Sequence, residues 1–220
     1  NSKIENQKKY LYSDLGYYFL EQIIEKLSNK KQNDYVAEIY RKLGLSLTYL
    51  PQKYFSIEQI APTENDIIFR KQVVQGFVHD PGAALMGGIA GHAGLFGNAY
   101  DVAKLMQFYV NKGNYKGEQL LDSNVVIEYT RKQAFNNNRR GLCFDKPEPD
   151  EKKDSPVTSL CSLESFGHSG FTGTFAWADP KNNLVFVFLS NRVYPNVEPN
   201  KLAKLGIRGK LHRALYEALK

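Results

Sequence analysis

The sequence contains few of the features that assign a chain at once to a specialised class of protein. It has only 2 cysteines among 220 residues, Cys143 and Cys161, and they form no CxxC pair. This excludes a disulfide-rich scaffold and a compact cysteine-ligated zinc site. We expect two free thiols, and one disulfide is the alternative if the protein is exported.

Long apolar runs are also lacking. No stretch approaches the roughly 20 apolar residues of a membrane-spanning helix, so we expect no membrane span. No secretory signal opens the chain, but its first residue is Asn1 rather than Met, and we expect it to be part of a longer protein. The compartment stays open, with a periplasmic or exported bacterial protein favoured.

A strong excess of one charge is lacking too. The formal net charge is +6, from 29 basic and 23 acidic residues, and the basic residues are scattered without interleaved aromatic side chains. We therefore expect no nucleic-acid partner. The hydrophobic content of 42% is that of an ordinary globular protein, and we expect no cofactor.

Apolar residues recur at helical spacing early in the chain. The spacing predicts a helix that begins at Ser13 or Asp14. Its apolar positions are Leu15, Phe19, Ile23 and Leu27. Further helices are expected over residues 34–45, 98–113, 122–133 and 200–219. Between the second and third helices, residues 46–80 contain prolines and are expected to form long ordered loops.

Two apolar runs near the C-terminus, TFAWA and LVFVFLS, are separated by the turn residues DPKNN. They predict antiparallel neighbouring strands over residues 172–178 and 184–190, with the C-terminal helix on one face. Because LVFVFLS is apolar on both sides, we expect a central strand with helices on both faces of the sheet. Early helices and late strands indicate an α+β fold.

Two triplets carry residue types that acyl-transfer chemistry requires. Tyr12-Ser13-Asp14 lies where a loop enters a helix, so its polar groups can face a substrate; the alternative is a buried tyrosine and an ordinary N-cap. His168-Ser169-Gly170 follows a glycine on the edge of a strand. Glycines there let backbone N–H groups point at an oxyanion, and a histidine titrates near neutral pH; the alternative is a hairpin end with a surface histidine.

A third stretch gathers two imidazoles and a carboxylate. His79 and Asp80 are followed by the glycine-rich segment GGIAGHAG, which contains His92. The spacing of the histidines matches no compact zinc pattern, so we expect no metal. Pairing of these histidines with Asp80 or with backbone groups is expected instead.

Together, Tyr-Ser-Asp at a helix start and His-Ser-Gly on a late strand resemble the serine β-lactamase and penicillin-binding-protein superfamily, in its class C-like branch. That superfamily uses Ser-x-x-Lys, then Tyr-x-Asn or Ser-x-Asn, then Lys-Thr-Gly or His-Thr-Gly. Longer stretches are similar to its members as well, including VHD, GHAGLF and SNRVYP. These resemble in particular the cell-wall-recycling N-acetylmuramoyl-L-alanine amidases, some of which are fused to a glycoside hydrolase family 3 domain.

The resemblance implies a β-lactamase/transpeptidase-like fold, in which an antiparallel sheet is flanked by helices and a helical subdomain is attached. We expect a single domain over residues 1–220, without the N-terminal strands and nucleophile helix of the family. Residues 1–134 are its mainly helical and loop part, 135–164 a polar surface excursion, and 165–220 the sheet hairpin with the C-terminal helix.

The resemblance also implies roles for the site residues. Tyr12 would relay a proton to the leaving amine, with Asp14 at the position of the family asparagine. His168 would replace the family lysine, supporting the proton equilibrium of Tyr12 and attracting a substrate carboxylate. The Phe171 N–H would be one oxyanion donor. The expected substrate-binding residues are Ser13, Ser169, Gly170, Phe171, Arg192, His79, Asp80 and His92.

The sequence departs from the family in three places. Asp14 keeps an acceptor but loses the amide donor of asparagine, while Ser169 keeps the hydroxyl of threonine. The nucleophile element should precede Tyr12 by many tens of residues, and only eleven residues are available. The one literal Ser-x-x-Lys match, Ser28 to Lys31, follows Tyr12 at a polar helix end and is interpreted as chance.

We therefore expect the C-terminal part of a serine hydrolase that acts on an amide or ester of a peptidoglycan-derived muropeptide and is inactive by itself. Its expected partners are this substrate and the missing N-terminal segment, with self-association through an unpaired sheet edge. One alternative is a degenerate, non-catalytic module that binds muropeptide or protein. The other is a β-lactamase or esterase.

Overall fold

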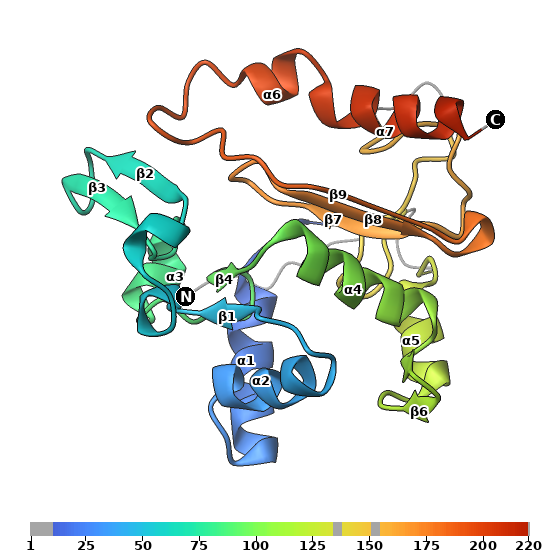
Figure 1. Cartoon of the computed structure of the whole chain (residues 1–220), viewed down its shortest axis with the longest axis horizontal. Helices are drawn as coiled ribbons and strands as arrows, with labels where there is room; N and C mark the ends of the chain where they lie inside the picture. The colour runs from blue at the N-terminus through green and yellow to red at the C-terminus, as the bar shows by residue number, and fades with distance from the viewer. Residues whose placement is uncertain (1–10, 134–137, 151–154, 220) are drawn as a thin grey trace.

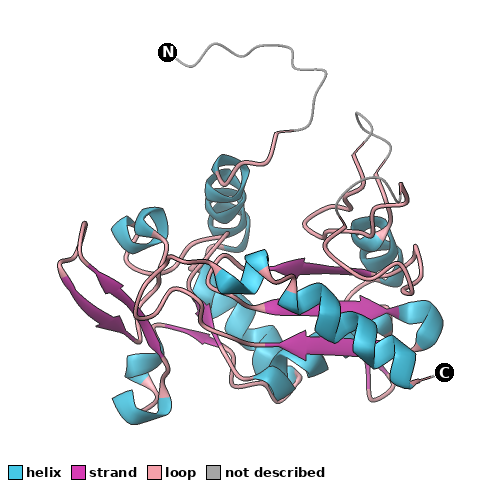
Figure 2. Cartoon of the chain, turned by 90° about the horizontal axis from the view of Figure 1, so that it is seen from above, coloured by secondary structure: helices cyan, strands magenta, loops and turns pink. Residues whose placement is uncertain are grey.

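The computed structural model describes residues 11–133, 138–150 and 155–219. Its centre is a three-stranded antiparallel sheet in the order β7 (Phe166–Ser169), β8 (Phe175–Asp179), β9 (Leu184–Phe188). Helix α7 (Ile207–Ala218) lies on one face and α4 (Ala99–Val110) on the other, as Figure 1 shows. Seen from above, α7 runs along the strands (Figure 2). The predicted α+β class and the antiparallel pairing of the two apolar runs are confirmed.

The alternation of side chains along β8 and β9 divides the core around this sheet into two clusters. On the α7 side, Phe175 and Trp177 pack with Val157, Cys161 and Tyr216. On the α4 side, Met106 packs with Phe166 and Ala178. Helices cover both faces as expected, because LVFVF offers apolar side chains to each. However, β9 is the edge strand of the described sheet and not a central one.

Helix α7 is fixed to the sheet by aromatic packing and one buried hydrogen bond. The His212 ring stacks on Phe186 with 5.4 Å between centroids, and burial lowers the pKa of His212 to about 4. The Tyr216 hydroxyl donates to Asp179 over 2.6 Å at the end of β8. The predicted single C-terminal helix is divided into α6 (Lys201–Lys204) and α7, because Gly206 between them has a φ of +61°.

The first two helices form where periodicity predicts them, but the first presents its apolar side outward. They are α1 (Leu15–Ser28) and α2 (Gln32–Lys42). In α1 the apolar side chains stay exposed, Phe19 to 70% and Leu27 to 83%, whereas Glu21 is buried and accepts a hydrogen bond from the Gly91 N–H over 3.1 Å. Burial raises the pKa of Glu21. A helix with this pattern is built to have its apolar side covered.

Two expectations about irregular regions are wrong. Residues 46–80 contain a hairpin, β2 (Pro62–Asp66) with β3 (Gln72–Gln75); the PTEND sequence of β2 is polar, and β3 has only two valines between glutamines. The stretch 135–164 is not a surface excursion throughout, since Asp145 and Lys146 are buried. Asp145 exchanges two backbone hydrogen bonds with Gly167 and so extends the sheet beside β7.

The remaining elements are short strands and short helices. They are β1 (Thr48–Tyr49), η1 (Pro51–Lys53), η2 (Ile57–Gln59), α3 (Pro81–Leu85), β4 (Leu95–Phe96), β5 (Asn114–Tyr115), β6 (Glu118–Gln119), α5 (Ser123–Thr130) and η3 (Pro180–Asn182). Cys143 and Cys161 are free thiols, the first exposed and the second buried. Across the described residues, none of the helices combines the length and apolar character needed to cross a membrane.

The sheet leaves no space for a side chain at Gly167 in β7. A Cβ there would collide with the Ala176 carbonyl and the Trp177 ring across the β7–β8 pair. We expect Gly167→Ala to lower the free energy of unfolding by about 1–3 kcal/mol, the usual cost of overpacking. Urea unfolding of both proteins measures it. Gly209→Ala is the matched control, because its Cβ meets open space in α7. Equal losses in the two variants would contradict this account.

Candidate active site

The structure brings Tyr12 and His168 together from distant parts of the sequence. Tyr12 lies in the loop that leads into α1, and His168 lies in β7. Their ring centroids are 6.4 Å apart and their planes are inclined by 33°. The Tyr12 side chain is 57% exposed, so this pair is accessible from solvent. No local sequence feature requires the proximity, which is a property of the fold.

Arg140 is the third member of this group, and it was not predicted from the sequence. Its Nη1 lies 3.3 Å from His168 Nε2, and its guanidinium carbon lies 5.0 Å from the centroid of the Tyr12 ring. Its Nη2 lies 3.6 Å from the buried Asp145 carboxylate. One guanidinium therefore contacts the phenol ring, the imidazole and a carboxylate. We call Tyr12, His168 and Arg140 the tyrosine–histidine–arginine cluster.

The turn after β7 presents backbone groups beside this cluster. The Gly170 N–H donates to the Thr174 carbonyl over 2.8 Å, and the Gly170 carbonyl accepts from Arg208 over 2.7 Å. Burial lowers the pKa of Arg208. For the Phe171 N–H, the described residues supply no hydrogen-bond acceptor. That N–H is thus available to a substrate oxygen, as an oxyanion donor must be.

Two side chains pack against the Phe171 ring in this turn. His79 stacks on it at 5.3 Å between centroids, and the Arg192 guanidinium lies 4.1 Å from the ring centroid. Arg192 Nε also donates to the Phe171 carbonyl over 2.6 Å. His79 and Arg192, both expected to contact substrate, therefore contact the turn itself in this structure.

The β2–β3 hairpin in turn supports His79. His79 Nδ1 lies 2.9 Å from Glu64 Oε1, at ion-pair distance but without hydrogen-bond geometry, so the neighbour of this nitrogen is Glu64 and not the expected Asp80. Arg70 joins Glu64 to Asp66 and donates to the His79 carbonyl over 3.0 Å. The hydrogen bond from Arg70 holds the pKa of Asp66 well below its usual range. This buried ionic network holds the β2–β3 hairpin against His79.

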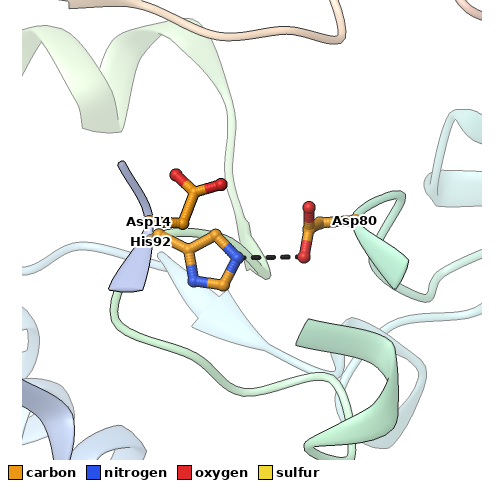
Figure 3. Close-up of side chains that lie close together, drawn as sticks. All are labelled: Asp14, Asp80 and His92. Carbon is orange, nitrogen blue, oxygen red and sulfur yellow. Dashed lines mark hydrogen bonds and ion pairs between the residues drawn. The ribbon is translucent and has the colours of Figure 1, made fainter. Parts of the chain in front are cut away.

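A second cluster contains Asp14, Asp80 and His92 (Figure 3). His92 Nε2 lies 2.9 Å from Asp80 Oδ1, which confirms the expected pairing of one histidine with Asp80. Asp80 also accepts from the Ala83 N–H over 2.7 Å at the start of α3. Burial alone would raise the pKa of Asp80, but the hydrogen bonds from Ala83 and His92 outweigh it and lower the pKa.

This second cluster has the residue types and the spacing of a metal site. One potential ligand atom from each residue lies within 4.8 Å of the others. In the structure, however, the His92 nitrogen and the Asp80 oxygen nearest each other are already bonded together, and Asp80 caps a helix. The contact between His92 Nε2 and Asp80 is thus a structural hydrogen bond, while His92 Nδ1 is buried without a hydrogen-bond partner among the described residues. The absence of a metal therefore stays a prediction.

The whole sequence places this geometry in a family. It matches the Beta-lactamase family over residues 3–208. The chain belongs to that family. Among curated relatives, it is 35% identical over 223 residues to a protein of Escherichia coli (strain K12) named "Putative D-alanyl-D-alanine carboxypeptidase", covering 94% of this chain and 51% of the relative. A Salmonella typhi relative of the same name is 35% identical over 211 residues, covering 87% of this chain and 48% of the relative.

This chain thus spans about half the length of the curated relatives it matches. Solved structures agree on the fold. A β-lactamase from Mycobacterium bovis superposes with a TM-score of 0.59 at 17% identity, covering 95% of this chain and 65% of that one. A penicillin-binding-protein homologue from Caulobacter crescentus gives 0.52 at 20% identity, covering 78% and 49%. The predicted β-lactamase/transpeptidase-like fold is confirmed.

Two serine hydroxyls outside the tyrosine–histidine–arginine cluster form hydrogen bonds with backbone groups. Ser13 Oγ accepts from the Leu15 N–H over 3.2 Å at the start of α1, while the N-cap residue Asp14 makes no side-chain cap. Ser28 Oγ donates to the Ile24 carbonyl over 2.7 Å. Lys31, three residues after Ser28, pairs with Glu25 instead. The Ser-x-x-Lys match therefore does not form a nucleophile and base, which agrees with its interpretation as chance.

Proposed function

We propose that this chain is the C-terminal part of a serine hydrolase that transfers the acyl group of a peptidoglycan-type peptide amide. The observation that carries the proposal is the proximity of Tyr12 and His168 beside the turn with the Phe171 N–H. These are a proton-transfer group and an oxyanion donor in one place, and acyl transfer needs both. Membership of the Beta-lactamase family supports the reaction class.

In the proposed reaction, a serine from a segment outside this chain attacks the amide carbonyl, and a lysine of that segment takes its proton. The carbonyl oxygen accepts a hydrogen bond from the Phe171 N–H as negative charge develops on it. The Tyr12 oxygen passes a proton to the leaving amine, with His168 supporting it. The Ser169 hydroxyl binds a substrate carboxylate, and Arg192 adds positive charge beside it.

Two surfaces of the chain support the involvement of a further segment. The apolar side of α1 is exposed at Leu15, Phe19, Ile23 and Leu27. The outer edge of β9 has no strand beside it among the described residues. An exposed apolar stripe and an open sheet edge are features that folded proteins normally cover. We propose that the segment carrying the nucleophile covers both.

Two likenesses support the proposed substrate class. The relatives' name concerns the bond between two D-alanines, and the GHAGLF and SNRVYP stretches resemble amidases that act between muramic acid and L-alanine. Both bonds are amides of peptidoglycan peptides. We propose this class, with the D-alanyl-D-alanine bond favoured by the relatives.

A substrate panel tests the proposal on the full-length protein. We expect kcat/KM for a peptide ending in D-alanyl-D-alanine to exceed that for a chromogenic cephalosporin or a p-nitrophenyl ester by roughly tenfold or more, because a site built to bind a peptide amide discriminates by its polar contacts. A muramoyl peptide in the same panel separates carboxypeptidase from amidase. Faster turnover of the cephalosporin or the ester would favour a β-lactamase or esterase. Tight muropeptide binding without any turnover would favour a non-catalytic module.

A further inference from the structure

Arg140 reaches the cluster from a polar stretch that has no regular secondary structure. Its neighbour Arg139 donates to Asp145 over 2.9 Å and to the Lys146 carbonyl over 3.1 Å. Asp145 is only 5% exposed and is bonded through its backbone to Gly167 in β7, the residue before His168. Asp145 therefore links the segment that carries Arg140 to the strand that carries His168.

The two ring nitrogens of His168 have opposite kinds of partner. Nδ1 lies 2.8 Å from the Ser169 carbonyl, which can only accept a hydrogen bond. Nε2 lies 3.3 Å from Arg140 Nη1, and a guanidinium can only donate. Both contacts are satisfied when the proton is on Nδ1 and the lone pair is on Nε2. An imidazolium would place an N–H against the guanidinium.

We propose that Arg140, and not His168, supplies the fixed positive charge beside Tyr12, and that it holds His168 as a neutral ring protonated on Nδ1. Arg140 is then a positioning residue for the Tyr12–His168 pair. The inference about His168 stands on geometry alone, while its catalytic consequence rests on the proposed function. It moves the cationic role that the family resemblance implied for His168 onto a residue of a different segment.

The Arg140 guanidinium is close enough to the Tyr12 ring to stabilise negative charge on the Tyr12 oxygen. A cation 5.0 Å from the ring centroid interacts favourably with the ring and still more favourably with a phenolate. The charged groups around the cluster include Asp145 and Arg139 on the same segment and Arg208, which reaches the turn after β7 from α7. Arginine keeps its charge at every working pH, whereas histidine as a residue type changes its charge near neutrality.

Nitrogen-15 NMR of the histidine rings tests the tautomer without requiring activity. The full-length protein is labelled at histidine, and His168→Gln identifies the signals of that ring. Near neutral pH we expect His168 to be neutral with the proton on Nδ1 alone. In Arg140→Met, which removes the donor, we expect a mixture of the two neutral tautomers. An imidazolium or an Nε2-protonated ring in the wild type would overturn the proposal, and so would an unchanged ring in Arg140→Met.

Kinetics test the charge, with Arg139 as the matched control. We expect Arg140→Met to lower kcat/KM by about tenfold or more, the lower range for an opposite charge within 6 Å of the group it stabilises. Arg140→Lys should restore most of this loss because it keeps the charge. Arg139→Met loosens the same anchor at Asp145 but leaves the guanidinium on Tyr12, and it should stay within about threefold of wild type, the scatter of a context effect.

Equal losses in Arg139→Met and Arg140→Met would reduce Arg140 to a structural role and overturn the proposal. A protein that hydrolyses none of the substrates contradicts the proposed function instead, and the NMR result then decides the inference about His168 by itself. The two failures are therefore distinguishable.

Discussion

Tyr12→Phe in the full-length protein is expected to lower turnover of a peptidoglycan-type peptide by roughly a hundredfold or more, the usual effect of removing a general acid–base group. The substitution removes one oxygen atom. The ring that lies 6.4 Å from His168 and under the Arg140 guanidinium stays in place. Because Tyr12 is 57% exposed, the loss of its hydroxyl should leave the free energy of unfolding nearly unchanged. The fall should thus be in kcat rather than in stability.

A second tyrosine provides the control for this measurement. Tyr100 is 73% exposed, and Lys104 Nζ lies 5.6 Å from its ring centroid, so it has the same combination of exposure and a neighbouring cation. Tyr100→Phe should retain wild-type turnover. Steady-state kinetics and thermal unfolding of both variants complete the comparison. Wild-type turnover in Tyr12→Phe would remove Tyr12 from the mechanism.

Periodicity in the sequence predicted those helices and strands whose buried side chains recur at regular spacing within one segment. The sheet hairpin and α4 were predicted because their side chains alternate at the spacing of a strand or a helix. The β2–β3 hairpin was not predicted, because β2 is polar, β3 is short, and Arg70 holds the hairpin through Glu64 and Asp66. Such a hairpin depends on ionic contacts between residues whose spacing in the sequence follows neither the helix nor the strand period.

The apolar stripe of α1 illustrates a second limit. Its spacing predicted the helix correctly, but the same spacing arises whether the stripe is covered by the chain's own core or by another segment. Only the structure shows that Leu15 and Phe19 are exposed while Glu21 is buried. Sequence pattern determines the amphipathic character of a helix and leaves its partner undetermined.

The candidate site was predicted in part through family resemblance. Tyr12 and His168 belong to the two triplets that carried the resemblance, and the structure places them side by side. Arg140 belongs to no triplet, and an arginine in a polar stretch is usually solvated. Its approach to His168 depends on Asp145 pairing with Gly167, which is a long-range contact without a local signature. The chemical roles of these residues remain predictions.

The chain of 220 residues, produced alone, is expected to form no covalent adduct with a fluorescent penicillin or a fluorophosphonate. Acylation needs an activated serine, whereas orientation and oxyanion stabilisation can only assist one. Ser28 cannot serve, because its hydroxyl donates to the Ile24 carbonyl at the end of α1 and Lys31 is paired with Glu25. We also expect the isolated chain to self-associate, since the α1 stripe and the β9 edge offer surfaces that a second copy can cover.

Labelling gels, mass spectrometry and size-exclusion chromatography measure both expectations, and the full-length protein is the control. Addition of the upstream segment, in the same chain or as a separate one, should restore labelling at a serine outside these residues and return the protein to a single defined size. Ser28→Ala should change nothing in the full-length protein, because that hydroxyl only closes a helix end. Stoichiometric labelling of the isolated chain, mapped to any of its own serines, would overturn the placement of the nucleophile. It would also show that the tyrosine–histidine–arginine cluster works with a nucleophile that this chain itself supplies.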